Sequence, residues 1–247
     1  NTAVVGLVES HAKKHEEGID AIVKEVKFDD GKDLRHIKLN GLLKKLKFGA
    51  ILDHPDLLRN ELKGKEGKDD EVGMLIMIEG LHGGEDLEAR ITDLSKKDPK
   101  EAAKIRGRFK AINDLFGHHT GDGVIKAFIY ALAMNLPEEP WGEMMLARGP
   151  PDRLYIYIQT SKDKIVTTKK IKSYLEKAQK TYEDICKFKI GLHASISQAI
   201  PAKDISTKHG VLFSQVDKVS LFLSYKNRET ENAVGTYEEL LKESLVE

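Results

Sequence analysis

Two pairs of histidines have spacings at which their side chains could bind a metal ion. His11 and His15 stand four residues apart in a segment with helical periodicity, and at this spacing two histidines on one helix can share a metal ion. No third ligand is evident near them, so we predict an ordinary half-exposed helical face instead. His118 and His119 are adjacent in a predicted loop, and a structural interpretation is preferred for them as well.

Other polar and aromatic residues also have two interpretations. Asn113 and Asp122 are of the types favoured at helix ends, so capping is one interpretation of both. Tyr155 and Tyr157 alternate with isoleucines; they could stack bases, although a half-buried strand is the commoner origin of this pattern. Cys186 is the only cysteine, which excludes an intramolecular disulfide and a cysteine-based zinc site.

The elements that must position these residues are helices alternating with strands. Helical spacing of apolar residues predicts helices over residues 2–27, 34–46, 55–62, 85–93, 99–112, 124–136 and 167–185. Apolar runs and alternation predict strands over residues 72–78, 154–158 and 188–197. Residues 211–226 suit either a helix or a strand. This order indicates an α/β or α+β sheet domain.

The composition argues against nucleic-acid and membrane binding. Among 247 residues, 40 Lys+Arg balance 40 Asp+Glu, so no overall field attracts the chain to nucleic acid or an anionic membrane. No apolar run approaches the roughly 20 residues that a membrane span needs. The N-terminus also lacks the basic-then-apolar order of a signal peptide. We therefore predict a cytoplasmic protein, with no membrane segment within this chain.

The most informative stretch is residues 109–122, which read FKAINDLFGHHTGD. It resembles the FKxIND-x-x-GHxxGD motif of GGDEF domains, the diguanylate cyclase family. Residues 147–154 stand where that family has its A-R-Y-G-G-D-E-F turn. Residues 188–197 look like its V-T-x-S-x-G strand, and residues 216–228 are similar to its last motif. The resemblance covers about residues 72–232.

This resemblance implies an α+β palm domain, in which a central and mainly antiparallel sheet is flanked by helices. We place an N-terminal helical segment at residues 1–60 and a degenerate GGDEF-like domain at residues 61–247. The family's first metal-binding aspartate is expected shortly before the FK pair, where this chain has none. An insertion over about residues 80–106 would explain this difference.

The resemblance also assigns roles to individual residues. In the family, each subunit binds one GTP, and two subunits join two GTP molecules into cyclic di-GMP with the help of Mg²⁺. Asn113 and Asp122 match the residues that pair with the guanine edge, and their donor and acceptor groups suit it. Arg228 matches an arginine that contacts phosphate, and Asp152 matches the first acid of the signature turn. Glu79, the only acid at the end of the first predicted strand, is the other candidate metal ligand beside Asp152.

The signature turn departs from the family pattern at three positions. Pro150 and Pro151 replace the two glycines, which removes two backbone N–H groups that could contact phosphate. Arg153 replaces the second acid, so a positive charge stands where a metal ligand or base is expected. The groups that would bind a metal ion and phosphate are therefore predicted to be lost. Mg²⁺ and GTP are expected to bind only if the site is functional.

We therefore predict a catalytically inactive GGDEF-like domain of bacterial cyclic di-GMP signalling. It would act by binding a protein partner or a guanine nucleotide, and residues 2–27 are expected to form a docking or homodimer helix. Two alternatives stay open. One is an active cyclase that uses Glu79 and Asp152 for metal, and the other is a helical adaptor whose sheet domain is an inert scaffold.

Overall fold

The structure is a computed structural model that describes residues 50–52, 54–82, 84–102, 108–116, 118–137, 141–150, 152–186, 189–226 and 232–244. Its described residues fall into two compact units. The sheet unit is drawn from residues 46–80, 136–174 and 192–247, and the helical unit from residues 81–135 and 175–191. The helices predicted over residues 2–27 and 34–46 lie outside the described residues.

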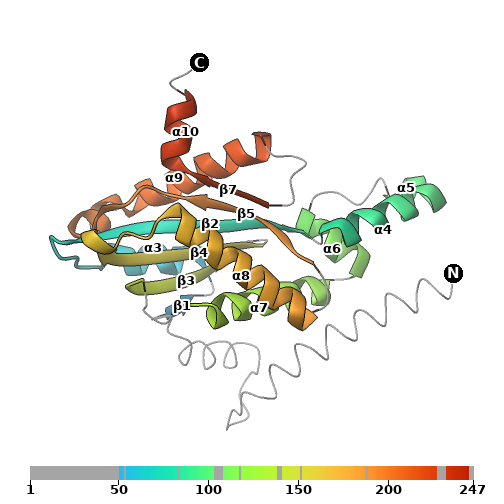
Figure 1. Cartoon of the computed structure of the whole chain (residues 1–247), viewed down its shortest axis with the longest axis horizontal. Coiled ribbons are helices and arrows are strands. Elements are labelled where there is room, and N and C mark those ends of the chain that lie inside the picture. The colour runs from blue at the N-terminus through green and yellow to red at the C-terminus, as the bar shows by residue number, and fades with distance from the viewer. Residues whose placement is uncertain are drawn as a thin grey trace, which may run out of the picture. The chain divides into compact units, whose positions relative to one another are not determined.

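The sheet unit contains a mixed sheet of seven strands (Figure 1). The strands are β1 (Ala50–Leu52), β2 (Glu71–His82), β3 (Glu143–Gly149), β4 (Arg153–Ser161), β5 (Gly191–Ile196), β6 (Ile200–Pro201) and β7 (Asn232–Thr236). They lie in the order β1-β3-β4-β2-β5-β7, with β6 paired to β2. The central strands β3, β4 and β2 are antiparallel, whereas β1 runs parallel to β3 and β7 parallel to β5. The predicted palm-like sheet is confirmed.

The two central strands are buried on both faces, which explains why they read as continuous apolar runs. Residues 72–78 of β2 and 154–160 of β4 are all buried. One face packs against helices α3 (Pro55–Lys63) and α9 (Ile205–Lys226). The side chains of this cluster come from both helices and three strands: Leu58, Leu62, Leu75, Met77, Met145, Ala147, Tyr155, Tyr157, Ile205, Leu212, Phe213 and Val216.

Smaller elements complete the sheet unit. The 3-10 turns η1 (Lys162–Lys164) and η2 (Ala202–Asp204) lie in connections, and α10 (Tyr237–Ser244) follows β7. As predicted, α3 begins at a proline, whose missing N–H costs nothing there. His54 caps α3 by accepting a hydrogen bond from the N–H of Asp56.

The helical unit contains α4 (Gly84–Lys97), α5 (Pro99–Ala102), α6 (Arg108–Phe116), α7 (His118–Met134) and the part of α8 (Thr168–Cys186) from Leu175 onward. Phe128 of α7 meets Tyr182 of α8 edge to face, with ring centroids 6.3 Å apart. Just after α7, the Asn135 side chain donates a hydrogen bond to the Thr181 hydroxyl at 2.8 Å. Helices α4 and α5 occupy most of the predicted insertion at residues 80–106.

Several predicted elements differ from the observed ones. Residues 211–226, whose pattern suited a helix or a strand, belong to the long helix α9. The predicted loop at His118 and His119 is wrong, because α7 already begins at His118 and continues through Gly121. Strands β1, β3, β6 and β7 and helix α10 were not predicted. The division at residue 60 stays a prediction, although α3 crosses it.

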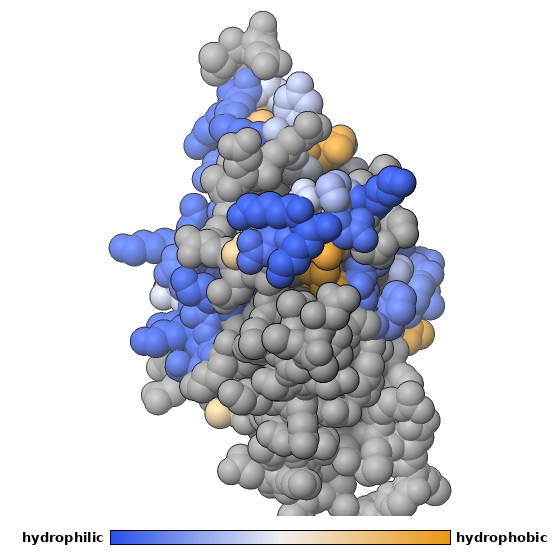
Figure 2. Space-filling model, turned by 90° about the vertical axis from the view of Figure 1, so that its right-hand side faces the viewer, coloured by the Kyte–Doolittle hydropathy of each residue, from blue (hydrophilic) through white to orange (hydrophobic). Residues whose placement is uncertain are grey.

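The described residues on the face shown in Figure 2 are mostly polar. Hydrophilic side chains dominate the coloured residues in Figure 2, and hydrophobic ones form small separate areas. No helix among the described residues is both long and apolar enough to span a bilayer.

Candidate functional site

The signature turn joins β3 to β4 and is held by the sheet register. Gly149 at the end of β3 pairs with Arg153 at the start of β4. On its other side, β4 is antiparallel to β2, with Ile78 opposite Leu154. This register brings Glu79, the next residue of β2, to the side of Arg153. Asp152 lies in the turn and is buried.

Arg153 forms the centre of a charged cluster. Its Nε donates a hydrogen bond to Glu79 Oε2 at 2.9 Å, and its Nη1 lies 3.7 Å from Asp217 Oδ1 of α9. Ser220, one turn further along α9, donates a hydrogen bond to Glu79 Oε1. Both carboxylate oxygens of Glu79 therefore have partners within the sheet unit. We call Glu79, Asp152, Arg153, Asp217 and Ser220 the arginine cluster.

Burial and neighbouring charges act in opposite directions on Glu79. Burial raises the pKa of this carboxyl, Arg153 lowers it, and the carboxylates of Asp152 and Asp217 raise it again, with a net increase. For Arg153, burial alone would lower the pKa, but Glu79, Tyr155 and Asp217 favour the charged form and raise it overall. Arg153 is therefore a fixed cation that compensates several surrounding acids.

The helical unit holds the two residues predicted to read guanine. Asn113 lies within α6 and Asp122 within α7, so the capping interpretation is wrong for both. Asn113 Oδ1 is buried and has no hydrogen-bond partner among the described residues. The same oxygen lies against Gly121, where an added Cβ would collide with it. A side chain at position 121 would therefore require the Asn113 side chain to move.

Residues 106–218 match the family model for the diguanylate cyclase GGDEF domain. The matched residues are those of a GGDEF domain. A solved structure of the diguanylate cyclase SiaD from Pseudomonas aeruginosa, in complex with its activator SiaC, is similar over 94% of this chain and 70% of that one, at 12% identity and a TM-score of 0.48. No curated protein matches the chain.

The matched part of the GGDEF domain includes the FKAIND motif, the signature turn and most of α9. Glu79 lies before the matched residues. Arg228 and Pro151 lie outside the residues that the structure describes, whereas Pro150 is described and exposed. Tyr155 and Tyr157 are both buried in the core, so the strand interpretation is confirmed and base stacking by either ring is wrong.

The residues around the signature turn of this GGDEF domain do not fit Mg²⁺. Glu79 is bound through both oxygens, and a guanidinium occupies the space beside it where a cation would be expected. A second positive charge at that place would be repelled. Among the described residues, no group of three His, Cys, Asp or Glu side chains is arranged to hold a metal ion.

Two members of the arginine cluster were not predicted as site residues. Asp217 and Ser220 are three residues apart, which places them on neighbouring positions of one helix. That spacing is visible in the sequence, but nothing in it indicates that α9 passes Glu79 of the distant strand β2. The signal was insufficient because the contact depends on the packing of α9 against the sheet.

Removing the Arg153 side chain should leave Glu79 as a buried carboxylate without its cationic partner. We expect Arg153→Met to lower the free energy of unfolding by about 2 kcal/mol near pH 7, since breaking a buried pair costs about 3–5 kcal/mol. The lower value reflects the 39% exposure of the Arg153 side chain. Urea denaturation of both proteins measures the difference.

The same variant should show a defined pH dependence. Without Arg153, burial and the neighbouring acids leave the folded-state pKa of Glu79 further above the ordinary value of 4.5. A raised folded-state pKa favours folding at low pH, so the deficit should shrink as the pH falls through that pKa toward 4.5. The double variant Glu79→Gln/Arg153→Met is the control and should show a smaller change. An equal pH dependence in both variants would contradict this assignment.

Proposed function

We propose that this GGDEF domain is a non-catalytic member of cyclic di-GMP-linked regulation, which acts by binding a guanine nucleotide or a protein. The observation that carries the proposal is the Arg153–Glu79 contact of 2.9 Å. Phosphoryl and nucleotidyl transfer depend on metal ions that offset charge on the phosphates. Here two acids of the arginine cluster, Glu79 and Asp217, are paired with a guanidinium.

The arginine is not a simple substitute for the metal. A guanidinium suits phosphate geometry, and on sequence alone Arg153 could have neutralised a triphosphate. However, its charge is already directed at Glu79 and Asp217. Pro150 also supplies no N–H at a position where a glycine would offer one. These features support weak phosphate binding and little dependence on Mg²⁺.

Recognition of the guanine base has separate support in the helical unit. The unsatisfied acceptor of Asn113 is costly when buried, and an N–H donor would remove that cost. Asp122 follows in α7 with a second acceptor group. Asn113 and Asp122 both belong to the motif over residues 109–122, which is separate from the signature turn in the sequence.

Calorimetry with GTP and ATP tests the proposal that the domain binds a guanine nucleotide. We expect GTP to bind with a dissociation constant on the order of 100 μM, or about −5.5 kcal/mol, and ATP to bind more weakly. Adding Mg²⁺ should change neither value appreciably. Asp122→Ala should remove the preference for GTP, because the acceptor for the guanine N–H groups is lost.

Asp114→Ala is the matched control, since this acid on α6 is paired with Lys110 at 2.7 Å and is exposed. It should leave the preference for GTP intact. Tight, Mg²⁺-dependent binding would support the alternative of an active cyclase. An absence of heat from both nucleotides would leave protein binding as the remaining activity.

A further inference from the structure

Helix α9 carries apolar side chains on the side that faces away from the sheet. Its inner side packs into the core of the sheet unit through Leu212, Phe213 and Val216. On its outer side, Leu221 is 74% exposed and Tyr225 81% exposed. These two side chains are one helical turn apart and together form a small apolar area of the kind that a partner can cover.

Six of the exposed residues of α9 form one stripe along the helix, which we call the α9 stripe. They are Gly210, Ser214, Asp217, Lys218, Leu221 and Tyr225, and all are exposed. At 100° per residue these positions fall within an arc of about 100° on one side of α9. The stripe is therefore a continuous surface rather than a set of scattered residues.

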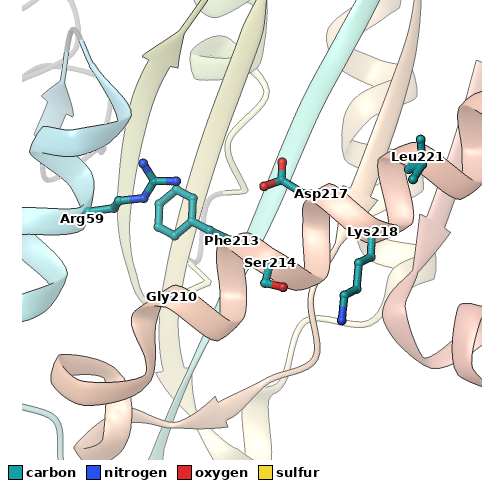
Figure 3. Close-up of a pocket in the computed structure, with 7 residues that line it drawn as sticks. All are labelled: Arg59, Gly210, Phe213, Ser214, Asp217, Lys218 and Leu221. Carbon is teal, nitrogen blue, oxygen red and sulfur yellow. The ribbon is translucent and has the colours of Figure 1, made fainter.

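A pocket of about 410 Å³ opens along this stripe, and the stripe residues from Gly210 to Leu221 line it (Figure 3). Phe213 lies beneath it, and the Arg59 guanidinium of α3 covers that ring at 4.3 Å from its centroid. An added Cβ at Gly210 would meet no atom within 4 Å, so the space over the backbone is open. The small residues Gly210 and Ser214 thus leave a hollow, and the large residues Leu221 and Tyr225 project further along the same helix.

From this arrangement we infer that the α9 stripe is a self-complementary surface that binds a second copy of this chain. Two α9 helices would lie antiparallel about a two-fold axis that passes between Asp217 and Lys218. In that register Asp217 faces Lys218 of the second copy. Leu221 then lies opposite Ser214, and Tyr225 lies opposite Gly210, so that each large side chain meets a small one.

The two-fold arrangement requires every contact to occur twice, and the α9 stripe satisfies that requirement. Opposite charges meet at the centre, and projecting apolar groups fill the hollows at both ends. A single helix of 22 residues is about 33 Å long, so the interface is small. We therefore expect a weak dimer that dissociates in the micromolar range.

Charge exchange tests the predicted register directly. Asp217→Lys and Lys218→Glu should each weaken dimerisation of the full chain by about tenfold, since each places like charges in contact twice. An equimolar mixture of the two variants should dimerise as the wild type does, because every central contact is then between opposite charges. Sedimentation velocity across a concentration series measures this. A wild-type monomer at all concentrations, or a mixture that fails to recover, would overturn the proposal.

Leu221→Glu provides an independent test of the apolar contacts. Because Leu221 is exposed, the change should preserve folding and weaken the dimer by about tenfold or more. Ile165→Glu is the control, since this residue is also an exposed hydrophobic outside the stripe. An equal effect of both variants, or of neither, would contradict the proposed surface. A photo-reactive residue at position 225 should cross-link near Gly210 of the second copy, and cross-links elsewhere would also contradict it.

Discussion

No cyclic di-GMP is expected to form when the protein is incubated with GTP and either Mg²⁺ or Mn²⁺. The physical reason is the guanidinium of Arg153, which lies 2.9 Å from the carboxylate of Glu79 and compensates the acids that would otherwise attract a cation. Preorganised charge provides a large part of the rate enhancement in such reactions. The loss of one hydrogen-bond donor alone lowers the rate on the order of 10²–10³-fold. We therefore expect a rate at least about 10³-fold below that of an active cyclase, measured as product by chromatography.

Replacing Arg153 by an acid distinguishes the lack of a metal site from a loss of folded structure as the reason for inactivity. Arg153→Glu would gather four carboxylates around the signature turn, and it should bind Mn²⁺ detectably where the wild type does not. Electron paramagnetic resonance of Mn²⁺ titrated into each protein provides that comparison. A steady product peak from the wild type that is absent in Asp152→Ala would show that the domain is an enzyme and that the arginine cluster does not prevent catalysis.

Tyr182→Ala should cause the largest loss of stability among the substitutions considered. Tyr182 is fully buried in the helical unit, where its ring meets Phe128 of α7 edge to face. Truncation of a large buried aromatic residue leaves a cavity and typically costs about 3–5 kcal/mol, so we expect a loss of about 4 kcal/mol. Denaturation in urea, followed by circular dichroism, measures it.

Tyr182→Phe is the matched control for this substitution. It retains the ring and its contact with Phe128 but removes the hydroxyl, so about 1 kcal/mol should be lost. Equal losses in the two variants would mean that the hydroxyl, not the packing of the ring, accounts for the stability contributed at this position.

The sequence by itself determined the elements in which the spacing of apolar residues fits only a helix or only a strand. The run over residues 72–78 lies within β2, and the helix predicted over 167–185 is α8. The motif over residues 109–122 was sufficient to identify the GGDEF domain, because its residues are local and fixed in spacing. Local patterns of this kind depend on backbone geometry, which neighbouring residues set among themselves.

Only the tertiary structure decided the state of the signature turn and the role of α9. Glu79 and Arg153 are 74 residues apart, and their contact depends on the register between β2 and β4. The pattern of α9 was ambiguous because its apolar residues lie on two sides, one in the core and one in the α9 stripe. A sequence pattern records how apolar residues are spaced along an element, but the charge that meets a given carboxylate is determined by which distant elements pack together.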